Sequence, residues 1–248
     1  MRQAPPASKL RALAAIVTYN NNDHVARVLE RIPPASERDY DVVVVDDGSR
    51  DDTPRYIAQF DFPVVRHPIN RGVGGAIKSA VQYALSNRYD VICILAGNNK
   101  DDPREIPRVL APIVAGQAEY VQGSRFANGG SHANTPAFRH VMVKVHARLF
   151  QVLTGFKGTD ALNGFRAYRL SLFSDPRLNI WQDWLDKYEY ETYLHYQVLR
   201  FGLPAVEVGV SKTYPPPVKR GKYSHIRPVL DWWKILRPIP LLLLGIRK

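Results

Sequence analysis

Polar side chains directly follow several apolar runs in this 248-residue sequence. The run VVVV ends in the paired carboxylates Asp46 and Asp47, and the later run ICILA is followed by Asn98, Lys100 and Asp101. Runs of this kind are typical of buried strands, and open α/β sheets bind ligands beyond the carboxyl ends of their strands. We therefore expect a ligand site at that edge, formed by Asn20, Asp46, Asp47, Asn70, Asn98 and Arg125.

The string VVVVDDGSRDDT is the most specific of these motifs. Gly48 permits a sharp turn after the strand, and Asp46 and Asp47 could accept hydrogen bonds from a ribose hydroxyl pair or a base imino group. The alternative is helix capping by Asp46, Asp47 or Ser49, which is a common use of these residues at strand-to-helix turns.

The string NRGVGGAIKSA predicts a glycine-rich loop that opens into a helix. Backbone amides at a helix start, beside Arg71 and Lys78, suit a diphosphate. The glycine spacing matches neither the usual dinucleotide pattern nor the Walker pattern, and close packing explains such glycines equally well.

Strand and helix signals alternate through the first half of the chain. Such alternation predicts an α/β fold with a mostly parallel sheet and helices on both faces. Strands are expected within 13–20, 40–49, 62–68, 89–97 and 118–126, and helices within 20–34, 51–60, 70–87 and 102–116.

The second half of the chain has a different character. It predicts an amphipathic helix over 138–155, a loop and short strand over 158–173, a helix over 184–202 and a strand over 203–216. We interpret residues 1–211 as a catalytic domain and residues 212–248 as a basic, Trp- and Leu-rich helical extension that binds membrane or acceptor.

The net charge of +11, from 34 Lys and Arg against 23 Asp and Glu, favours an anionic partner. Nucleic acid is disfavoured because the basic residues cluster late and no nucleic-acid-binding pattern occurs. We expect no signal peptide and no spanning helix. The single cysteine, Cys93, lies in an apolar run, so we interpret it as a core residue in a reducing compartment.

Five motifs, taken in order, resemble those of family 2 glycosyltransferases. They are VDDGS, NRGVGGA, the turn ending in DDP, VQGSRFANGG and TDALNGFRAYR. The group most similar contains dolichol-phosphate mannose synthases and bacterial polyprenyl-phosphate relatives, and the likeness extends over about 14–210. The resemblance implies a GT-A fold with a Rossmann-like sheet and a nucleotide-diphosphate sugar donor. It also implies inversion at the anomeric carbon and a polyprenyl phosphate acceptor.

The resemblance also implies roles for individual residues. The catalytic residues carried over are Arg125, Asp160 and Arg166, in which the two arginines grip phosphates; Lys100 joins this set from its own charge, because it departs from the family pattern. Acceptor binding is expected from Ser124, Lys219, Arg220, Lys222 and Tyr223, because KRGKYS resembles an element near the acceptor loop. The donor set is Thr18, Tyr19, Asn20, Asp46, Asp47, Asn70, Arg71, Gly72, Gly74, Lys78, Ala96, Gly97 and Asn98.

One motif departs from the family, whose members carry an Asp-Xaa-Asp-Xaa-Gln metal motif after the fourth strand. Aligned on Asp102, the two metal aspartates become Ala96 and Asn98, and the glutamine becomes Lys100. Three readings remain open. Lys100 replaces the charge of the metal; Mg²⁺ or Mn²⁺ is still held by Asn98, Asp101 and the donor diphosphate; or the aspartates only cap a helix and catalysis is lost. Helix capping by Asp102 is expected in all three readings.

The acceptor decides which catalytic groups are needed. A phosphate acceptor is already anionic at neutral pH, so positioning and leaving-group stabilisation dominate. A hydroxyl acceptor would need a base, for which Asp160 and Glu191 are the candidates, whereas Glu189 is expected to be solvated or structural. A soluble sugar acceptor and a nucleotide-binding pseudoenzyme are the alternative functions.

The last segment combines basic residues with Trp232, Trp233 and the run Leu241–Leu244. This composition is typical of a segment on an anionic membrane surface, and a packed C-terminal helix is the alternative. We expect a cytoplasmic protein that is peripheral at the inner face of the plasma membrane.

Overall fold

The computed structural model describes residues 10–214 and 230–247. The acceptor residues expected at Lys219, Arg220, Lys222 and Tyr223 lie outside the described residues.

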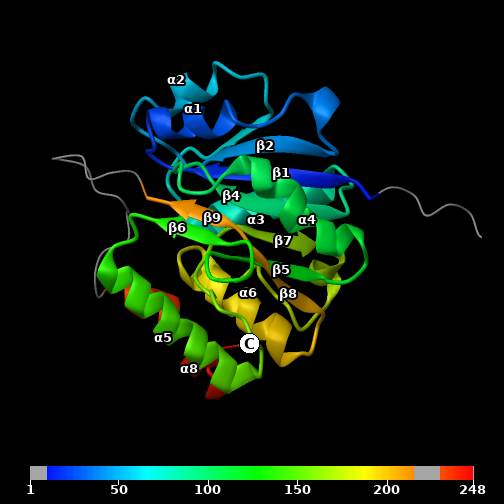
Figure 1. Ribbon diagram of the computed structural model, residues 1–248. Coiled ribbons are helices and arrows are strands. Elements are labelled where there is room, and N and C mark those ends of the chain that lie inside the picture. The colour runs from blue at the N-terminus through cyan, green and yellow to red at the C-terminus, as the bar shows by residue number, and fades with distance from the viewer. Residues whose placement is uncertain (1–9, 215–229, 248) are drawn as a thin grey trace, which may run out of the picture.

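A seven-stranded sheet in the order β3-β2-β1-β4-β7-β5-β8 forms the centre of the molecule (Figure 1). β7 is antiparallel to β4 and β5, and the other neighbouring strands are parallel. The predicted mostly parallel α/β fold is therefore confirmed. The strands are β1 (Ala12–Thr18), β2 (Tyr40–Asp46), β3 (Val64–Arg66), β4 (Val91–Ala96), β5 (Tyr120–Ser124), β7 (Arg166–Arg169) and β8 (Ala205–Gly209).

Helices cover both faces of this sheet. The helices are α1 (Asp23–Leu29), α2 (Thr53–Ile57), α3 (Val73–Ser86), α4 (Ile106–Val114), α5 (Ala137–Thr154), α6 (Glu189–Arg200), α7 (Leu230–Leu236) and α8 (Pro238–Leu243). Short 3₁₀ turns occupy Ala35–Glu37, Pro103–Glu105, Leu170–Ser174 and Asp183–Leu185. None of the described helices has the length and apolar character needed to cross a bilayer.

The central strands β1, β2 and β4 are buried on both faces of the sheet, which explains their nearly unbroken apolar sequences. Successive side chains of a strand point to opposite faces, so Leu13, Ala15 and Val17 join one core cluster whereas Ala14 and Ile16 join the other. The first cluster lies on the side of α3 and α6, and the second on the side of α1 and α4.

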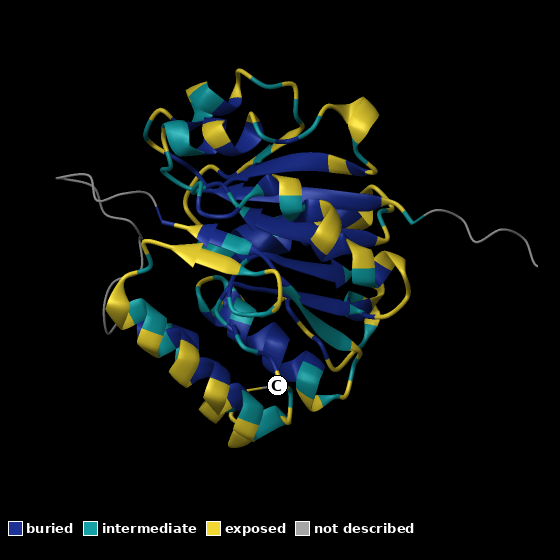
Figure 2. Ribbon diagram, viewed as in Figure 1, coloured by how far each residue is buried: buried dark blue, intermediate teal, exposed yellow. Residues whose placement is uncertain are grey.

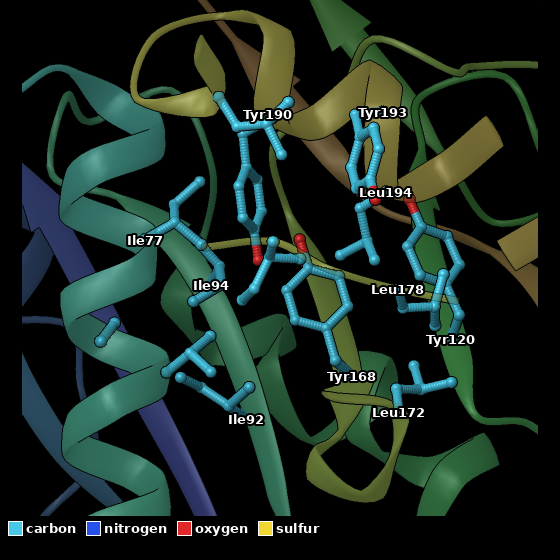
Figure 3. Close-up of a cluster of buried hydrophobic side chains, with 14 of the residues drawn as sticks. Ile77, Ile92, Ile94, Tyr120, Tyr168, Leu172, Leu178, Tyr190, Tyr193 and Leu194 are labelled. Atoms are coloured by element: carbon cyan, nitrogen blue, oxygen red, sulfur yellow. The ribbon is translucent and has the colours of Figure 1, made fainter. Parts of the chain in front are cut away.

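Five buried tyrosines distinguish the cluster on the side of α3 and α6, and Figure 3 labels all of them except Tyr196. Tyr120 and Tyr168 come from β5 and β7, and Tyr190 and Tyr193 come from α6. The Tyr120 and Tyr168 ring centroids lie 5.6 Å apart. These large rings fill the space between α6 and the end of the sheet that contains the antiparallel strand.

The strand expected over 203–216 is two strands rather than one. β8 pairs with β5, but the chain then changes partner at Val210, and β9 (Ser211–Thr213) pairs with β6 (Ser131–Ala133) in a separate two-stranded sheet. The Val210 amide donates to Ser124 O, and Val210 O accepts from Ser131 N, so this residue joins the two sheets. The continuous apolar pattern did not reveal the change of partner. The domain boundary expected at residue 211 falls within β9 and stays a prediction.

Candidate active site

The carboxyl ends of β1, β2, β4 and β5 meet at one edge of the sheet. In the register of the parallel strands, Thr18 lies opposite Asp46, and Val17 lies opposite Ala96. Ser124 ends β5 at the same edge. The structure therefore brings the candidate residues that follow these strands together.

The turn after β1 is tied to the loop after β2. Asn20, at φ 48°, receives a hydrogen bond on Oδ1 from Arg50 N at 2.9 Å, and its own amide donates to Ser49 Oγ at 2.9 Å. Tyr19, which directly precedes Asn20, is half-buried. These bonds hold the two loops that the family resemblance assigns to the nucleotide.

The carboxylate of Asp47 is fully engaged by the loop after β3. Its Oδ1 lies 2.7 Å from His67 Nδ1 and accepts from Arg71 N at 2.9 Å. Its Oδ2 accepts from Asn70 Nδ2 and from Gly72 N, both at 2.8 Å. Asp47 therefore fixes the shape of the loop at 67–72. No pattern in the sequence indicated His67, whose other ring nitrogen lies 2.8 Å from Ser79 Oγ.

Asp46 accepts fewer hydrogen bonds from the chain than Asp47 does. Its Oδ1 accepts from Ser49 N at 3.0 Å, whereas its buried Oδ2 has no hydrogen-bond donor and lies 3.3 Å from Arg66 Nε. A shallow pocket opens beside this pair, lined by Gly48, Ser49, Arg50, Arg66, His67 and Pro68.

The glycine-rich loop packs closely against residues 182–187. A Cβ at Gly74 would lie 1.9 Å from Leu185 O, and one at Gly72 would lie 2.5 Å from Asp186 O. Lys78 Nζ donates to Asp186 Oδ1 at 2.5 Å and to Gln182 O at 2.8 Å. Packing therefore accounts for these glycines, and the ammonium expected beside a diphosphate is bonded to a carboxylate of the chain.

The turn after β4 is organised by its own side chains. Gly97 packs on Thr18, since an added Cβ would lie 2.9 Å from the Thr18 side chain. Asn98 Oδ1 accepts from Lys100 N at 3.2 Å. Asp102 caps the turn at Pro103–Glu105 by accepting from Arg104 N at 3.1 Å. The predicted capping role of Asp102 is confirmed.

Asp101 forms a buried ion pair with Lys212, a residue that sequence reasoning placed in the extension and not in the site. Lys212 Nζ donates to the two carboxylate oxygens of Asp101 at 2.7 and 2.8 Å, and to Asn163 Oδ1 at 2.9 Å. The exposed fraction is 1% for Asp101 and 8% for Lys212. The sequence offered one weak signal for this pair, namely that Lys212 falls within the strand predicted over 203–216.

Lys100 lies beside this ion pair in a crowded basic environment. Its Nζ lies 5.0 Å from the ring centroid of Tyr214, and the Arg139 guanidinium lies 5.8 Å from the same ring. Burial, reinforced by the charges of Lys212 and Arg139, lowers the pKa of Lys100 from 10.5 to about 7. We refer to Lys100, Arg125, Arg139 and Lys212 as the cation cluster.

Arg125 is oriented by Asp160, which is fully buried. Arg125 Nε donates to Asp160 Oδ2 at 2.6 Å, and Nη2 donates to Oδ1 at 3.3 Å. The carboxylate of Glu207 accepts from Asp160 N at 2.8 Å and from Thr159 N at 2.7 Å. Glu207 therefore fixes the backbone at Thr159 and Asp160, and so the place of the Asp160 carboxylate. No sequence motif indicated this role for Glu207.

Arg166 lies inside the core at 1% exposure. Its guanidinium donates to the carbonyl oxygens of Asn163, Ala161 and Glu191 at 2.7, 3.1 and 2.8 Å. These bonds join the loop at 160–164 to α6. Arg166 can thus shape the wall behind Asp160, while its expected contact with phosphate stays a prediction.

Ser124 also bonds within the chain. Its Oγ lies 2.7 Å from Thr159 Oγ1 and accepts from Phe126 N and Ala127 N. Glu189, expected to be solvated or structural, is buried and forms an ion pair with Arg237 at 2.5 Å.

The side chains after β4 fit a metal ion poorly in this arrangement. Ala96 offers no ligand atom, the Oδ1 of Asn98 already accepts a backbone hydrogen bond, and both oxygens of Asp101 hold an ammonium. No group of three or more His, Cys, Asp or Glu side chains within 10–214 and 230–247 has the geometry to hold a metal. Cations of the chain occupy this region.

Residues 14–175 match the sequence profile of glycosyl transferase family 2, and the chain belongs to this family. It is a glycosyltransferase.

The chain is 28% identical over 207 residues to the undecaprenyl-phosphate mannosyltransferase of Micrococcus luteus, covering 82% of this chain and 83% of that protein. It is 28% identical over 209 residues to the polyprenol monophosphomannose synthase of Mycolicibacterium smegmatis, covering 82% and 77%. It is 29% identical over 253 residues to the undecaprenyl-phosphate 4-deoxy-4-formamido-L-arabinose transferase of Klebsiella pneumoniae, covering 98% and 72%.

Solved structures share the GT-A fold. Mannosyl-3-phosphoglycerate synthase from Rubrobacter xylanophilus superposes with a TM-score of 0.68 at 20% identity, covering 96% of this chain and 76% of that one. Glucosyl-3-phosphoglycerate synthase from Mycobacterium tuberculosis, in complex with Mn²⁺, uridine diphosphate and glucosyl-3-phosphoglycerate, gives 0.67 at 17% identity, covering 96% and 81%. At these identities the likeness establishes the fold.

Proposed function

We propose that this glycosyltransferase moves a sugar from a nucleotide diphosphate to a polyprenyl phosphate, with inversion at the anomeric carbon. The observation that carries the proposal is the cation cluster at the carboxyl ends of β4 and β5. It holds four basic side chains near the carboxylates of Asp101 and Asp160. An excess of basic side chains suits a site that receives a donor diphosphate and a phosphate acceptor. The named relatives are polyprenyl-phosphate sugar transferases, which supports the same acceptor.

The donor would lie across the loops after β1 and β2. Asp46 Oδ2 accepts no hydrogen bond within the chain, so the nucleoside could bond to it by displacing Arg66, and the loop that Asp47 shapes forms the adjoining wall. The sugar diphosphate would extend toward the turn after β4. Asp160, Arg125 and Lys100 then face the sugar and the two phosphates.

The reaction needs no strong base in this proposal. The acceptor phosphate oxygen is already anionic and attacks the anomeric carbon in line, while the bond to the diphosphate breaks. Both oxygens of Asp160 already accept hydrogen bonds from Arg125. Asp160 is thus suited to orienting Arg125, and the main chemical contribution is stabilisation of the leaving diphosphate by fixed cations.

We propose that Lys100 supplies the charge that a metal supplies elsewhere in the family. The competing reading holds Mg²⁺ or Mn²⁺ through the donor diphosphate with Asn98 and Asp101, and Mn²⁺ in a structure of the same fold makes a metal plausible. That reading requires Asp101 to exchange the Lys212 ammonium for the metal.

A membrane surface and a cytoplasmic, inner-face location belong to the same proposal. A polyprenyl phosphate is held in a bilayer by its hydrocarbon chain, so the enzyme must work at that surface. The basic composition of residues 212–248 supports such a location.

The test incubates the purified chain with UDP-, GDP- and dTDP-sugars and a short polyprenyl phosphate in detergent. A lipid-linked sugar with at least one donor is expected, and none with any donor would refute the proposal. Turnover of a soluble sugar without lipid would favour the alternative acceptor.

The same assay in EDTA distinguishes the two readings of the turn after β4. If Lys100 replaces the metal, activity persists in EDTA, and Lys100→Ala lowers it about 100-fold. The matched control is Lys157→Ala, which removes an exposed lysine. Loss of activity in EDTA that Mn²⁺ restores would contradict the role of Lys100.

A further inference from the structure

The outward face of α5 carries a stripe of exposed apolar side chains. Phe138, Val141, Val145, Leu149 and Val152 are 61, 57, 56, 38 and 71% exposed. At about 100° per residue, these five positions fall within an arc of about 80° on the helix. We refer to them as the α5 stripe.

The α5 stripe is separate from the face of α5 that stabilises the fold. Val143, His146, Ala147 and Phe150 are buried on the inward face, which packs against α6. Figure 2 shows buried and exposed residues alternating along this helix at the border of the molecule. α5 is therefore apolar on two faces, and the core needs only one of them.

The charge along α5 itself has one sign. The chain contains no acidic residue from Phe126 to Thr159, whereas Lys144 and Arg148 are exposed on one flank of the stripe. A protein partner or a second copy would need acidic side chains to match these bases, and α5 itself offers none. Anionic lipid headgroups supply that charge, and lipid chains accept the apolar stripe.

Neighbouring helices extend the apolar surface. α7 and α8 pack against α6 as α5 does, and the Phe138 and Trp232 rings lie 6.0 Å apart. Trp233 is 62% exposed on α7, and Leu243, Leu244 and Ile246 are 56, 73 and 61% exposed at the end of α8. Figure 1 shows α5 and α8 at the end of the molecule away from β2.

The first turn of α5 lies at the candidate active site. Arg139 Nη1 approaches the Tyr214 hydroxyl at 3.5 Å, and Lys100 lies over the same ring. An apolar surface that begins here would leave a phosphate at the membrane surface close to the cation cluster, while the hydrocarbon chain of the lipid stays in the bilayer.

We propose that the α5 stripe is the surface on which this protein docks to an anionic lipid bilayer. The stripe enters the interface, and Lys144 and Arg148 contact lipid phosphates. The inference deepens the proposed function, on which it rests for the identity of the acceptor. Vesicle binding itself can be measured without any transfer reaction.

The test compares Val145→Glu/Val152→Glu with the matched control Val114→Glu. Val114, at the end of α4, is 55% exposed and lies outside the α5 stripe. The protein is sedimented with vesicles of phosphatidylcholine alone or with 30% phosphatidylglycerol. We expect wild type and the control to bind the anionic vesicles, and the double variant to bind them at least about 10-fold more weakly. Thermal unfolding and circular dichroism verify that each variant is folded.

Activity measurements separate this inference from the proposed function. With the acceptor in detergent, the double variant should match wild type; with the acceptor in vesicles, it should lose about 10-fold in rate. The inference is overturned if wild-type protein does not bind anionic vesicles, or if the double variant binds them as tightly as wild type. Either result holds against it even if lipid-linked sugar is formed. A wild-type dimer that the double variant dissociates would instead assign the stripe to a second copy. Vesicle binding without any lipid-linked sugar would refute the proposed function alone.

Discussion

Removal of the Lys212 ammonium tests whether the site is built around its cations. Lys212→Met retains the apolar stem of the side chain but leaves the carboxylate of Asp101, which is 1% exposed, without its two hydrogen bonds from the ammonium. An ion pair broken inside a protein costs about 3–5 kcal/mol of stability, because one charge stays buried and uncompensated. Lys100 and Arg125 remain near Asp101, so we expect the lower end, about 3 kcal/mol.

An exposed ion pair of the same length provides the control. Arg27 Nη2 lies 2.7 Å from Asp23 Oδ2 on α1, but these side chains are 60% and 43% exposed. Arg27→Met should cost less than about 1 kcal/mol, because water replaces the lost partner. The two ion pairs have the same length, so the difference in lost stability between Lys212→Met and Arg27→Met reflects the burial of the first pair.

The assay is urea unfolding monitored by tryptophan fluorescence. It is applied to Lys212→Met, to Arg27→Met, and to the variants that complete the double-mutant cycle, Asp101→Asn and Asp101→Asn/Lys212→Met. The double variant removes both charges, so it should be more stable than the sum of its single changes by about 1–3 kcal/mol. A cost below about 1 kcal/mol for Lys212→Met, or strict additivity in the cycle, would refute the reasoning. If donor binding replaces Lys212 by a dication, Mn²⁺ with nucleotide should stabilise Lys212→Met more than wild type.

Two further predictions concern the packing around the site. Burial lowers the pKa of His146 to about 3, so below pH 6.5 the unfolded chain binds a proton that the folded chain does not. The contribution of His146 to the free energy of unfolding should then fall by about 2 kcal/mol between pH 6.5 and 5. Burial also lowers the pKa of His195, so His146→Phe should reduce the decline measured in urea titrations without abolishing it, and an unchanged slope would contradict the prediction. Gly74→Ala places a methyl group against Leu185 O and should cost about 2 kcal/mol of stability; a cost below about 0.5 kcal/mol would mean that the loop at 182–187 shifts freely.

Local patterns predicted the elements of this fold well, because strand and helix periodicity is a property of neighbouring residues. The strands that end at Thr18, Asp46 and Ala96 were expected, and with them the edge of the sheet at which the candidate residues gather. The cap by Asp102 was also expected, since it involves residues two apart in the sequence.

Partners that are distant in the sequence could not be predicted in the same way. Lys212 and Asp101 are 111 residues apart, and Asp160 and Glu207 are 47 apart. Sequence patterns therefore predicted that Lys212 belongs to the extension, whereas the pairing of β9 with β6 brings it into the site.

The sequence by itself determined which residue types stand at the carboxyl ends of the strands, because strand termination is encoded locally. Only the tertiary structure decided how those residues are used. It engages Asp47 with the loop after β3 and pairs an oxygen of Asp46 with Arg66, and it buries Arg166 among carbonyl groups. The physical reason is that a buried charge must find its partners within reach, and packing between distant segments alone decides which groups those are.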